Sequence, residues 1–175
     1  MSGQVTIKGV DDDMFFGDNE ALVIPVNANG GVHGAGLALY ASKRWPKTMQ
    51  AYSDQAKLYY GRDHFVPGGV WSFLGDGGKV RLILAATKDH WSDPSQLLWV
   101  EQCCTGIESV VHNFKVRSVA IPAIGSGLGG LSWEVVLPVL TARAKRIAEL
   151  DCDVSIYPPK PQPTKRGGRG YNGRR

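Results

Sequence analysis

Two glycine-rich segments constrain this chain more than any other feature of its sequence. Each follows an apolar, strand-like stretch and precedes a helix-like stretch, and they read VNANGGVHGAGLAL (residues 26–39) and IGSGLGG (residues 124–130). In an open α/β sheet, ligands bind at the carboxyl ends of the strands. We therefore expect the two segments to lie at the same edge of one sheet, although about a hundred residues separate them.

Strand-like and helix-like stretches alternate around these segments. The predicted strands span residues 5–7, 20–27, 69–74, 79–86, 117–121 and 154–157. The predicted helices span residues 35–42, 46–57, 92–112 and 132–150, with Pro138 expected to kink the last one. Gly75-Asp76-Gly77-Gly78 predicts a tight turn between the third and fourth strands. The alternation predicts an α/β fold with helices on both faces of a mixed sheet.

The backbone chemistry of the glycine segments indicates a phosphate-containing ligand. Glycine allows a ligand to approach the main chain closely, and a helix N-terminus offers unpaired N–H groups to an anion. Neither segment contains the GK[ST] of a P-loop, and Gly31-x-x-Gly34-x-Gly36 is not the dinucleotide fingerprint. A single such segment could equally form a tight turn and nothing more. Two at one edge favour the ligand.

Composition indicates the cellular compartment and argues against a bound metal or a membrane span. Cys103, Cys104 and Cys152 form no pairing framework, which indicates free thiols in a reducing compartment. Their spacing matches no zinc pattern, so no metal or other cofactor is expected. The sequence contains no signal-peptide core and no apolar run long enough to span a bilayer. These features predict a cytoplasmic protein without membrane contact, and we expect it to be a monomer.

The basic residues are concentrated at the carboxyl end. The net charge is +4, but the last 16 residues carry six basic side chains and no acidic one, so the remaining 159 residues have a net charge of −2. We divide the chain into a domain of residues 1–158 and a disordered tail of residues 159–175. Such a tail favours DNA or RNA contact, or it only aids solubility or is a cloning remnant. Its candidate nucleic-acid contacts are Lys165, Arg166, Arg169, Arg174 and Arg175.

Four stretches of the chain resemble the macrodomain family, the ADP-ribose-binding fold. In the family's order they are EALVIPVN, HGAGLALYASKRWP, ATKDHWSDPSQLLWVE and IPAIGSGLGGLSWE, within a resemblance that covers residues 5–157. They are most similar to the branch that contains the DarG-type antitoxin macrodomain and the terminal ADP-ribose glycohydrolase. The resemblance implies a three-layer α/β/α fold with a central mixed sheet, and ADP-ribose as ligand.

The resemblance also implies which residues contact ADP-ribose. The first glycine segment would wrap the distal ribose and one phosphate, through Asn27, Gly34, Ala35, Gly36 and Leu37. The second would close over the pyrophosphate, through Gly125, Ser126, Gly127, Leu128 and Gly129. Asp11, or in its place Asp12, would meet the adenine amino group, unless this is only a solvated acidic loop. Tyr157 would stack on adenine, or else is an ordinary edge or core aromatic.

Two residues are implied in catalysis. Lys88 matches the family lysine that attacks the anomeric carbon of the distal ribose, and an amine is a competent nucleophile there once its pKa is depressed. The alternative is a solvated lysine that ends a strand. His33 stands where the DarG type usually has methionine, and it is either a general acid or base or a hydrogen-bonding filler. We interpret His90 and Trp91 as site wall and core packing.

These assignments predict a hydrolase that removes ADP-ribose from a modified target. The terminal glycohydrolase carries an aspartate at the position of Gly129, whereas the DarG type has glycine there, like this chain. This difference favours a nucleic-acid target over protein esters. One alternative is a phosphatase on ADP-ribose 1″-phosphate, with His33 and Asn27 around the distal phosphate. Another is a module that binds ADP-ribose without turnover.

Overall fold

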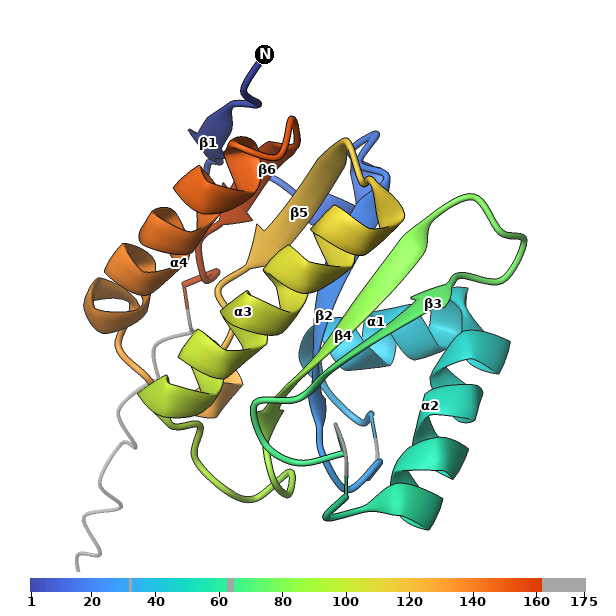
Figure 1. The fold of residues 1–175 in the computed structure, drawn as a ribbon. Helices are drawn as coiled ribbons and strands as arrows, with labels where there is room; N and C mark the ends of the chain where they lie inside the picture. Colours follow the sequence, from blue (N-terminus) through green and yellow to red (C-terminus); the bar gives the residue numbers. More distant parts are fainter. Residues whose placement is uncertain (32, 63–64, 162–175) are drawn as a thin grey trace, which may run out of the picture.

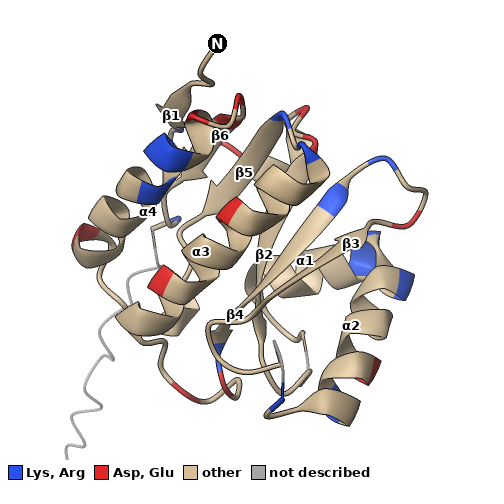
Figure 2. Ribbon diagram, viewed as in Figure 1, with Lys and Arg blue, Asp and Glu red and all other residues tan. Residues whose placement is uncertain are grey.

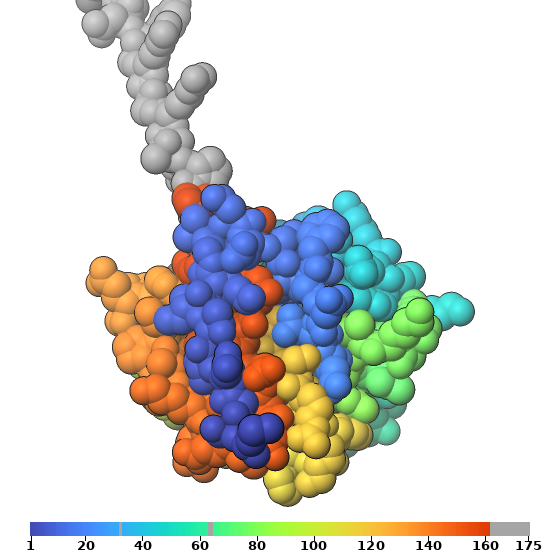
Figure 3. All heavy atoms as spheres, turned by 90° about the horizontal axis from the view of Figure 1, so that it is seen from above, coloured from blue at the N-terminus to red at the C-terminus, as the bar shows by residue number. Residues whose placement is uncertain are grey.

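One mixed sheet organises the computed structural model, which describes residues 1–31, 33–62 and 65–161 (Figure 1). The six strands formed by these residues are β1 (Val5–Ile7), β2 (Ala21–Asn27), β3 (Val70–Leu74), β4 (Arg81–Lys88), β5 (Ser118–Pro122) and β6 (Asp153–Tyr157). Their order is β1-β6-β5-β2-β4-β3, and every neighbouring pair is parallel except β3 with β4. Seen from above, N-terminal residues (dark blue) lie directly beside C-terminal residues (red-orange), as the pairing of β1 with β6 requires (Figure 3).

Two pairs of helices cover the two faces of this sheet. Helices α1 (Gly36–Arg44) and α2 (Pro46–Tyr59) lie on one face, and α3 (Leu97–Phe114) and α4 (Trp133–Ala148) lie on the other (Figure 1). Two short 3₁₀ turns, η1 (Met14–Phe16) and η2 (Gly127–Gly129), lie in connecting loops. The predicted three-layer α/β/α fold with a mixed sheet is therefore confirmed.

Strand β2 shows why the central strands are apolar throughout. Val23 packs among the side chains under α3 and α4, whereas Leu22 and Ile24 pack among those under α1 and α2. Successive side chains of a strand point to opposite faces, so a strand covered on both faces must be apolar at every position. The charged residues lie mainly on helices and loops, while the strands carry few of them (Figure 2).

The helix predicted over residues 92–112 begins later than expected, at Leu97. The Asp93 carboxylate accepts a hydrogen bond from the His90 N–H at 3.3 Å, and the Asp93 N–H donates to the His90 carbonyl at 3.1 Å. Asp93 therefore closes a turn instead of capping a helix, and residues 89–96 form an irregular loop. Helix α4 is assigned without a break through Pro138.

The predicted tight turn between β3 and β4 also fixes the start of α2. The Asp76 carboxylate accepts hydrogen bonds from the Lys47 N–H at 3.0 Å, the Thr48 N–H at 2.9 Å and the Thr48 hydroxyl at 2.7 Å. Trp45, the residue before the helix, provides no side-chain cap. Asp76 thus supplies from another element the acceptor that an N-terminal turn needs.

The remaining predictions about composition concern cysteines and the tail. Cys103, Cys104 and Cys152 are free and buried, as predicted. Within the described residues, no helix is both long and apolar enough to cross a bilayer. The described part of the chain ends at residue 161, so the tail contacts predicted at Lys165, Arg166, Arg169, Arg174 and Arg175 lie outside it.

Candidate functional site

A cavity of ≈ 1330 Å³ lies at the carboxyl edge of the sheet, the lower edge in Figure 1. Both glycine segments line it, so the structure brings them together as expected. The predicted site residues that line the cavity are Asn27, His33, Gly34, Ala35, Gly36, Leu37, Lys88, Gly125, Ser126, Gly127, Leu128, Gly129 and Tyr157. Asp11 is exposed and does not line it, whereas the alternative Asp12 does.

The strand order gives the cavity a direction. Tyr157 ends β6, Pro122 ends β5, Asn27 ends β2 and Lys88 ends β4, and these four strands are adjacent and parallel. Neighbouring strands lie about 4.8 Å apart, so roughly 14 Å separates the two outer strand ends. The second glycine segment follows β5 and the first follows β2, so both lie between these ends. The cavity therefore suits an elongated ligand held by backbone at its middle.

The first glycine segment presents an open helix N-terminus. Helix α1 begins at Gly36, and the preceding Ala35 has no side chain that could cap it. Gly36 has a φ of 59°, in the left-handed region that favours glycine. The uncapped N–H groups of the first turn thus face a cavity lined by residues 33–38, the arrangement that binds a phosphate.

The second glycine segment is a compact turn held from both sides. The Leu131 N–H donates to the Gly125 carbonyl at 3.0 Å, and the Ser95 N–H donates to the Gly129 carbonyl at 2.9 Å. Gly125 has a φ of 79°, and a Cβ there would lie 2.6 Å from Val100 Cγ2, so no other residue fits without strain. The Ser126 hydroxyl is buried and has no hydrogen-bond partner among the described residues. Its hydrogen-bonding capacity is therefore unused, although the oxygen itself is enclosed by protein atoms.

Lys88 lies where the two glycine segments meet. It pairs with Asn27 across β2 and β4, next to an irregularity in the register. Its ammonium donates to the Leu128 carbonyl at 2.6 Å and to the Trp91 carbonyl at 3.3 Å. The side chain is thus aimed across the cavity toward the second glycine segment, which a simple solvated strand-end lysine would not do.

His33 lies at the base of the first glycine segment. Its Nε2 is 3.1 Å from the Ser53 hydroxyl of α2, and its ring centroid is 6.1 Å from that of Tyr52. Burial, with a further contribution from Lys57, lowers the pKa of His33 below its ordinary value. Nδ1 is buried without a partner in the described structure. The imidazole is therefore neutral near pH 7, and its unpartnered Nδ1 is enclosed by protein atoms.

The far end of the cavity is aromatic and acidic. Tyr157 lines it although only 8% of its surface is exposed, and burial raises the pKa of its phenol. Phe15 stacks on Tyr40 with ring centroids 4.1 Å apart, and both line the cavity beside Asp12. Sequence reasoning missed Phe15 and Tyr40. The apolar Met-Phe-Phe directly after three aspartates was the available signal.

Trp91 differs from its predicted role. It lines the cavity, which agrees with a place in the site wall, but 63% of its surface is exposed, so it is not core packing. Because Asp93 folds residues 89–96 into a loop, Trp91 lies on that loop and not on a helix face that packs against the sheet.

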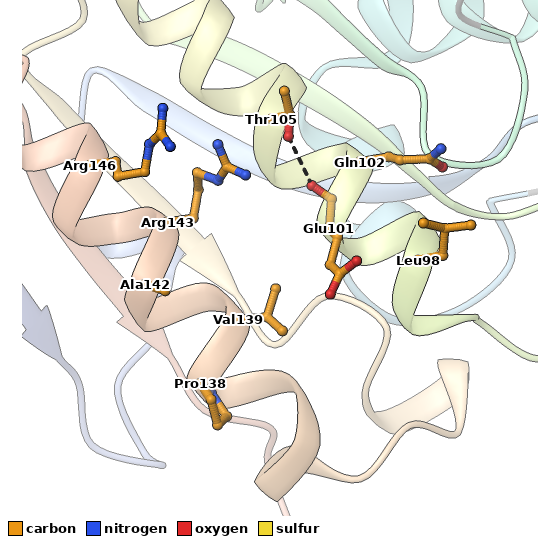
Figure 4. A pocket seen from close by; sticks show the side chains of 9 residues that line it. All are labelled: Leu98, Glu101, Gln102, Thr105, Pro138, Val139, Ala142, Arg143 and Arg146. Carbon is orange, nitrogen blue, oxygen red and sulfur yellow. Dashed lines mark hydrogen bonds between the residues drawn. The ribbon is translucent and has the colours of Figure 1, made fainter.

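A second depression, of ≈ 620 Å³, lies between α3 and α4 (Figure 4). It is lined by apolar side chains such as Leu98 and Val139 and by Arg143 and Arg146, both of which pair with Glu108. None of the predicted site residues lines it. Among the described residues, no group of three or more His, Cys, Asp or Glu side chains is arranged to hold a metal ion.

Comparison with known proteins identifies the family of this chain. A sequence model of the family described as "Macro domain" matches residues 23–140. The DNA ADP-ribosyl glycohydrolase of Mycobacterium tuberculosis is 35% identical over 150 residues, which cover 84% of this chain and 40% of that protein. The chain therefore spans about two fifths of the length of this relative.

Solved structures are similar over nearly the whole described domain. The macrodomain of Mycobacterium tuberculosis DarG is 32% identical, with a TM-score of 0.79, and the match covers 90% of this chain and 99% of that one. Thermosipho africanus DarTG, solved in complex with ADP-ribose, is 27% identical, with a TM-score of 0.76 over 91% of this chain and 43% of that one.

Proposed function

The chain belongs to the macro domain family, and on that premise we propose that it is a hydrolase that removes ADP-ribose from a modified nucleic acid. Three relatives, of which this chain covers about two fifths of the length, are named DNA ADP-ribosyl glycohydrolases. The proposal carries that activity to this domain.

The layout of the cavity supports ADP-ribose as the ligand. Its aromatic end, with Tyr157, Phe15 and Asp12, suits adenine, because the rings offer flat apolar surface and the carboxylate can accept from the amino group. The two glycine segments suit the pyrophosphate in the middle. Lys88 and His33 then border the distal ribose.

The position of Lys88 is the observation that carries the hydrolytic proposal. Its Nζ bonds to the second glycine segment at the Leu128 carbonyl, and its backbone pairs with Asn27, where the first glycine segment begins. After loss of a proton, its lone pair forms a bond to C1″ while the bond from C1″ to the nucleobase breaks with its electron pair. The base takes up a proton, and water then releases ADP-ribose and restores the amine. We assign the role of proton acceptor to His33, which lines the cavity and is neutral near pH 7.

The surroundings of Gly129 support a nucleic-acid target over protein esters. A Cβ at this position would lie 2.5 Å from the Ser95 hydroxyl oxygen and 3.1 Å from Ser95 Cβ. The buried Ser95 thus occupies the space that an aspartate would need. The carboxylate that the terminal glycohydrolase uses on esters has no room here without a shift of Ser95.

Product analysis tests the proposal directly. The full chain is incubated with single-stranded DNA carrying thymidine- or guanine-linked ADP-ribose, and release is followed by chromatography and mass spectrometry. We expect free ADP-ribose and unmodified DNA as products. Lys88→Ala should lose release by more than a hundredfold while its Kd for ADP-ribose stays within a few-fold of the wild type, because the backbone contacts to the ligand remain.

The matched control is Lys79→Ala, in the exposed turn between β3 and β4, which should release ADP-ribose at the wild-type rate. Full activity in Lys88→Ala would remove Lys88 from the mechanism. Phosphate release from ADP-ribose 1″-phosphate, without release from DNA, would establish the phosphatase instead. Binding without any product would establish the non-catalytic module.

A further inference from the structure

Trp91 is a large apolar side chain that the domain leaves in solvent at the mouth of the cavity. With 63% of its surface exposed, the Trp91 indole buries little apolar area and so contributes little to the stability of the fold. The only ring contact recorded for it in the described structure is with His90, at 5.5 Å between centroids and tilted by 45°. A flat aromatic surface is thus presented outward beside the proposed nucleophile.

The loop that carries Trp91 is braced from several directions. The Tyr60 hydroxyl donates to the Asp89 carboxylate at 2.6 Å, and the Asn29 N–H donates to the Asp89 carbonyl at 3.3 Å. His90 Nδ1 lies 2.7 Å from the Ser92 hydroxyl. The first two bonds tie the loop to the end of α2 and to the first glycine segment, and the third lies within the loop. The exposed indole is therefore carried by a loop that hydrogen bonds already hold in place. A ligand that binds to the indole pays little for ordering the loop.

A second exposed apolar residue bonds to the same ammonium through its backbone carbonyl. Leu128 is 66% exposed and belongs to the second glycine segment. The Lys88 ammonium donates to the carbonyls of both Leu128 and Trp91, so the two loops meet on either side of it. Two exposed apolar residues thus hold, through their backbone carbonyls, the group that would attack the sugar.

From this juxtaposition we propose that Trp91 and Leu128 form a binding subsite for the nucleobase from which ADP-ribose is released. The inference rests on the proposed function, because Lys88 marks the place where the bond to the target breaks. On the cavity side of that bond lies the ribose, so the leaving base lies outside, at the mouth, where these two side chains are.

The chemistry of the pair suits an unstacked base. An indole offers the flat surface on which any nucleobase stacks, and a leucine closes the opposite side without demanding a hydrogen-bond pattern. A base held this way must first leave its own stack, which a single strand permits more easily than a duplex. The subsite therefore favours ADP-ribosylated single-stranded nucleic acid over targets with an aliphatic leaving group.

The test compares Trp91→Ala and Trp91→Phe on two ligands. On an ADP-ribosylated single-stranded oligonucleotide, Trp91→Ala should lower kcat/KM about tenfold or more, and Trp91→Phe should retain most of the activity, because it keeps a stacking ring. The Kd for free ADP-ribose, measured by calorimetry, should be unchanged in both. Leu98→Ala, an exposed apolar residue outside the cavity, is the matched control and should match the wild type on both ligands.

Two results would overturn the subsite: wild-type kcat/KM in Trp91→Ala, or equal weakening of free ADP-ribose and of the oligonucleotide. If the wild-type protein releases nothing, the proposed function fails. The subsite is then judged by binding in the Lys88→Ala background. There the modified oligonucleotide should bind more tightly than free ADP-ribose, and Trp91→Ala should remove the difference. Equal affinities would reject the subsite independently of turnover.

Discussion

His33 is the residue whose surroundings most restrict what its side chain can do. Its Nε2 is held by the Ser53 hydroxyl at 3.1 Å, while Nδ1 is buried and unpartnered in the described part of the chain. Burial and the nearby Lys57 lower its pKa, so protonation is disfavoured in the folded state. An imidazole in this state can accept a proton, but it holds no imidazolium proton to donate.

A pH profile of kcat/KM tests this role for His33. Because the pKa lies below 6.5, the wild-type rate should fall only as the pH drops below that value. His33→Met, which installs the residue usual in the DarG type, should lower the rate at least tenfold at pH 7.5 and remove that acidic limb. If the variant keeps both rate and limb, His33 only fills space and another group sets the profile.

At the scale of elements, the junction of α2 with the turn between β3 and β4 shows one element completing another. Hydrogen bonds from Thr48 and Lys47 hold the pKa of the Asp76 carboxyl below its ordinary range, although desolvation acts in the opposite direction. A depressed pKa contributes stability that is present above the unfolded pKa and lost as the pH falls through the folded pKa.

Asp76→Asn should therefore lower the Tm by a few degrees at pH 7, because the charge at the start of α2 is lost. Differential scanning calorimetry from pH 7 to pH 2.5 should show the two proteins converging at the acidic end, where Asp76 is protonated. Asp54→Asn provides the control, since its carboxylate is exposed and accepts a hydrogen bond from Gln50 on the same helix. A constant difference across the range would contradict the cap.

The sequence predicted a helix or strand correctly where the residues of that segment alone determine its structure. β2 lies within the predicted residues 20–27 because a strand covered on both faces is apolar at every position. The meeting of the two glycine segments at one edge of the sheet was also predictable, because each segment directly follows a central strand. The start of α3 was not, since Ser92-Asp93-Pro94 has the composition of a helix start and only the folded loop shows that Asp93 bonds to His90.

At the scale of the molecule, the site depends on which distant segments of the chain become neighbours. Phe15 and Tyr40 meet at one end of the cavity, although 25 residues separate them, and no local pattern in the sequence indicates that contact. Asp11 and Asp12 are adjacent and chemically alike, so only the turn around Gly9 decides which one lines the cavity. Such choices belong to the tertiary structure.

The basic tail makes a prediction that the sequence alone supports. Removing the residues after Pro159 should weaken binding of unmodified DNA or RNA, because six basic side chains are lost. Fluorescence anisotropy at 50 and 200 mM salt should show a steep salt dependence only for the full chain, while the Kd for free ADP-ribose stays the same. Equal nucleic-acid affinity with and without the tail would show that it has no role in binding.

The place of β6 in the sheet has a consequence for how the domain comes into being during synthesis. β6 is the last strand of the described chain, yet it lies between β1 and β5 and is the only neighbour of β1 in the sheet. A chain emerging from the ribosome therefore carries its first strand unpaired until its final strand arrives, a long-range closure that slows folding. Tyr157 is among the last residues to take its place. The end of the cavity that Tyr157 lines is thus completed last, after β2 to β5 have paired with one another.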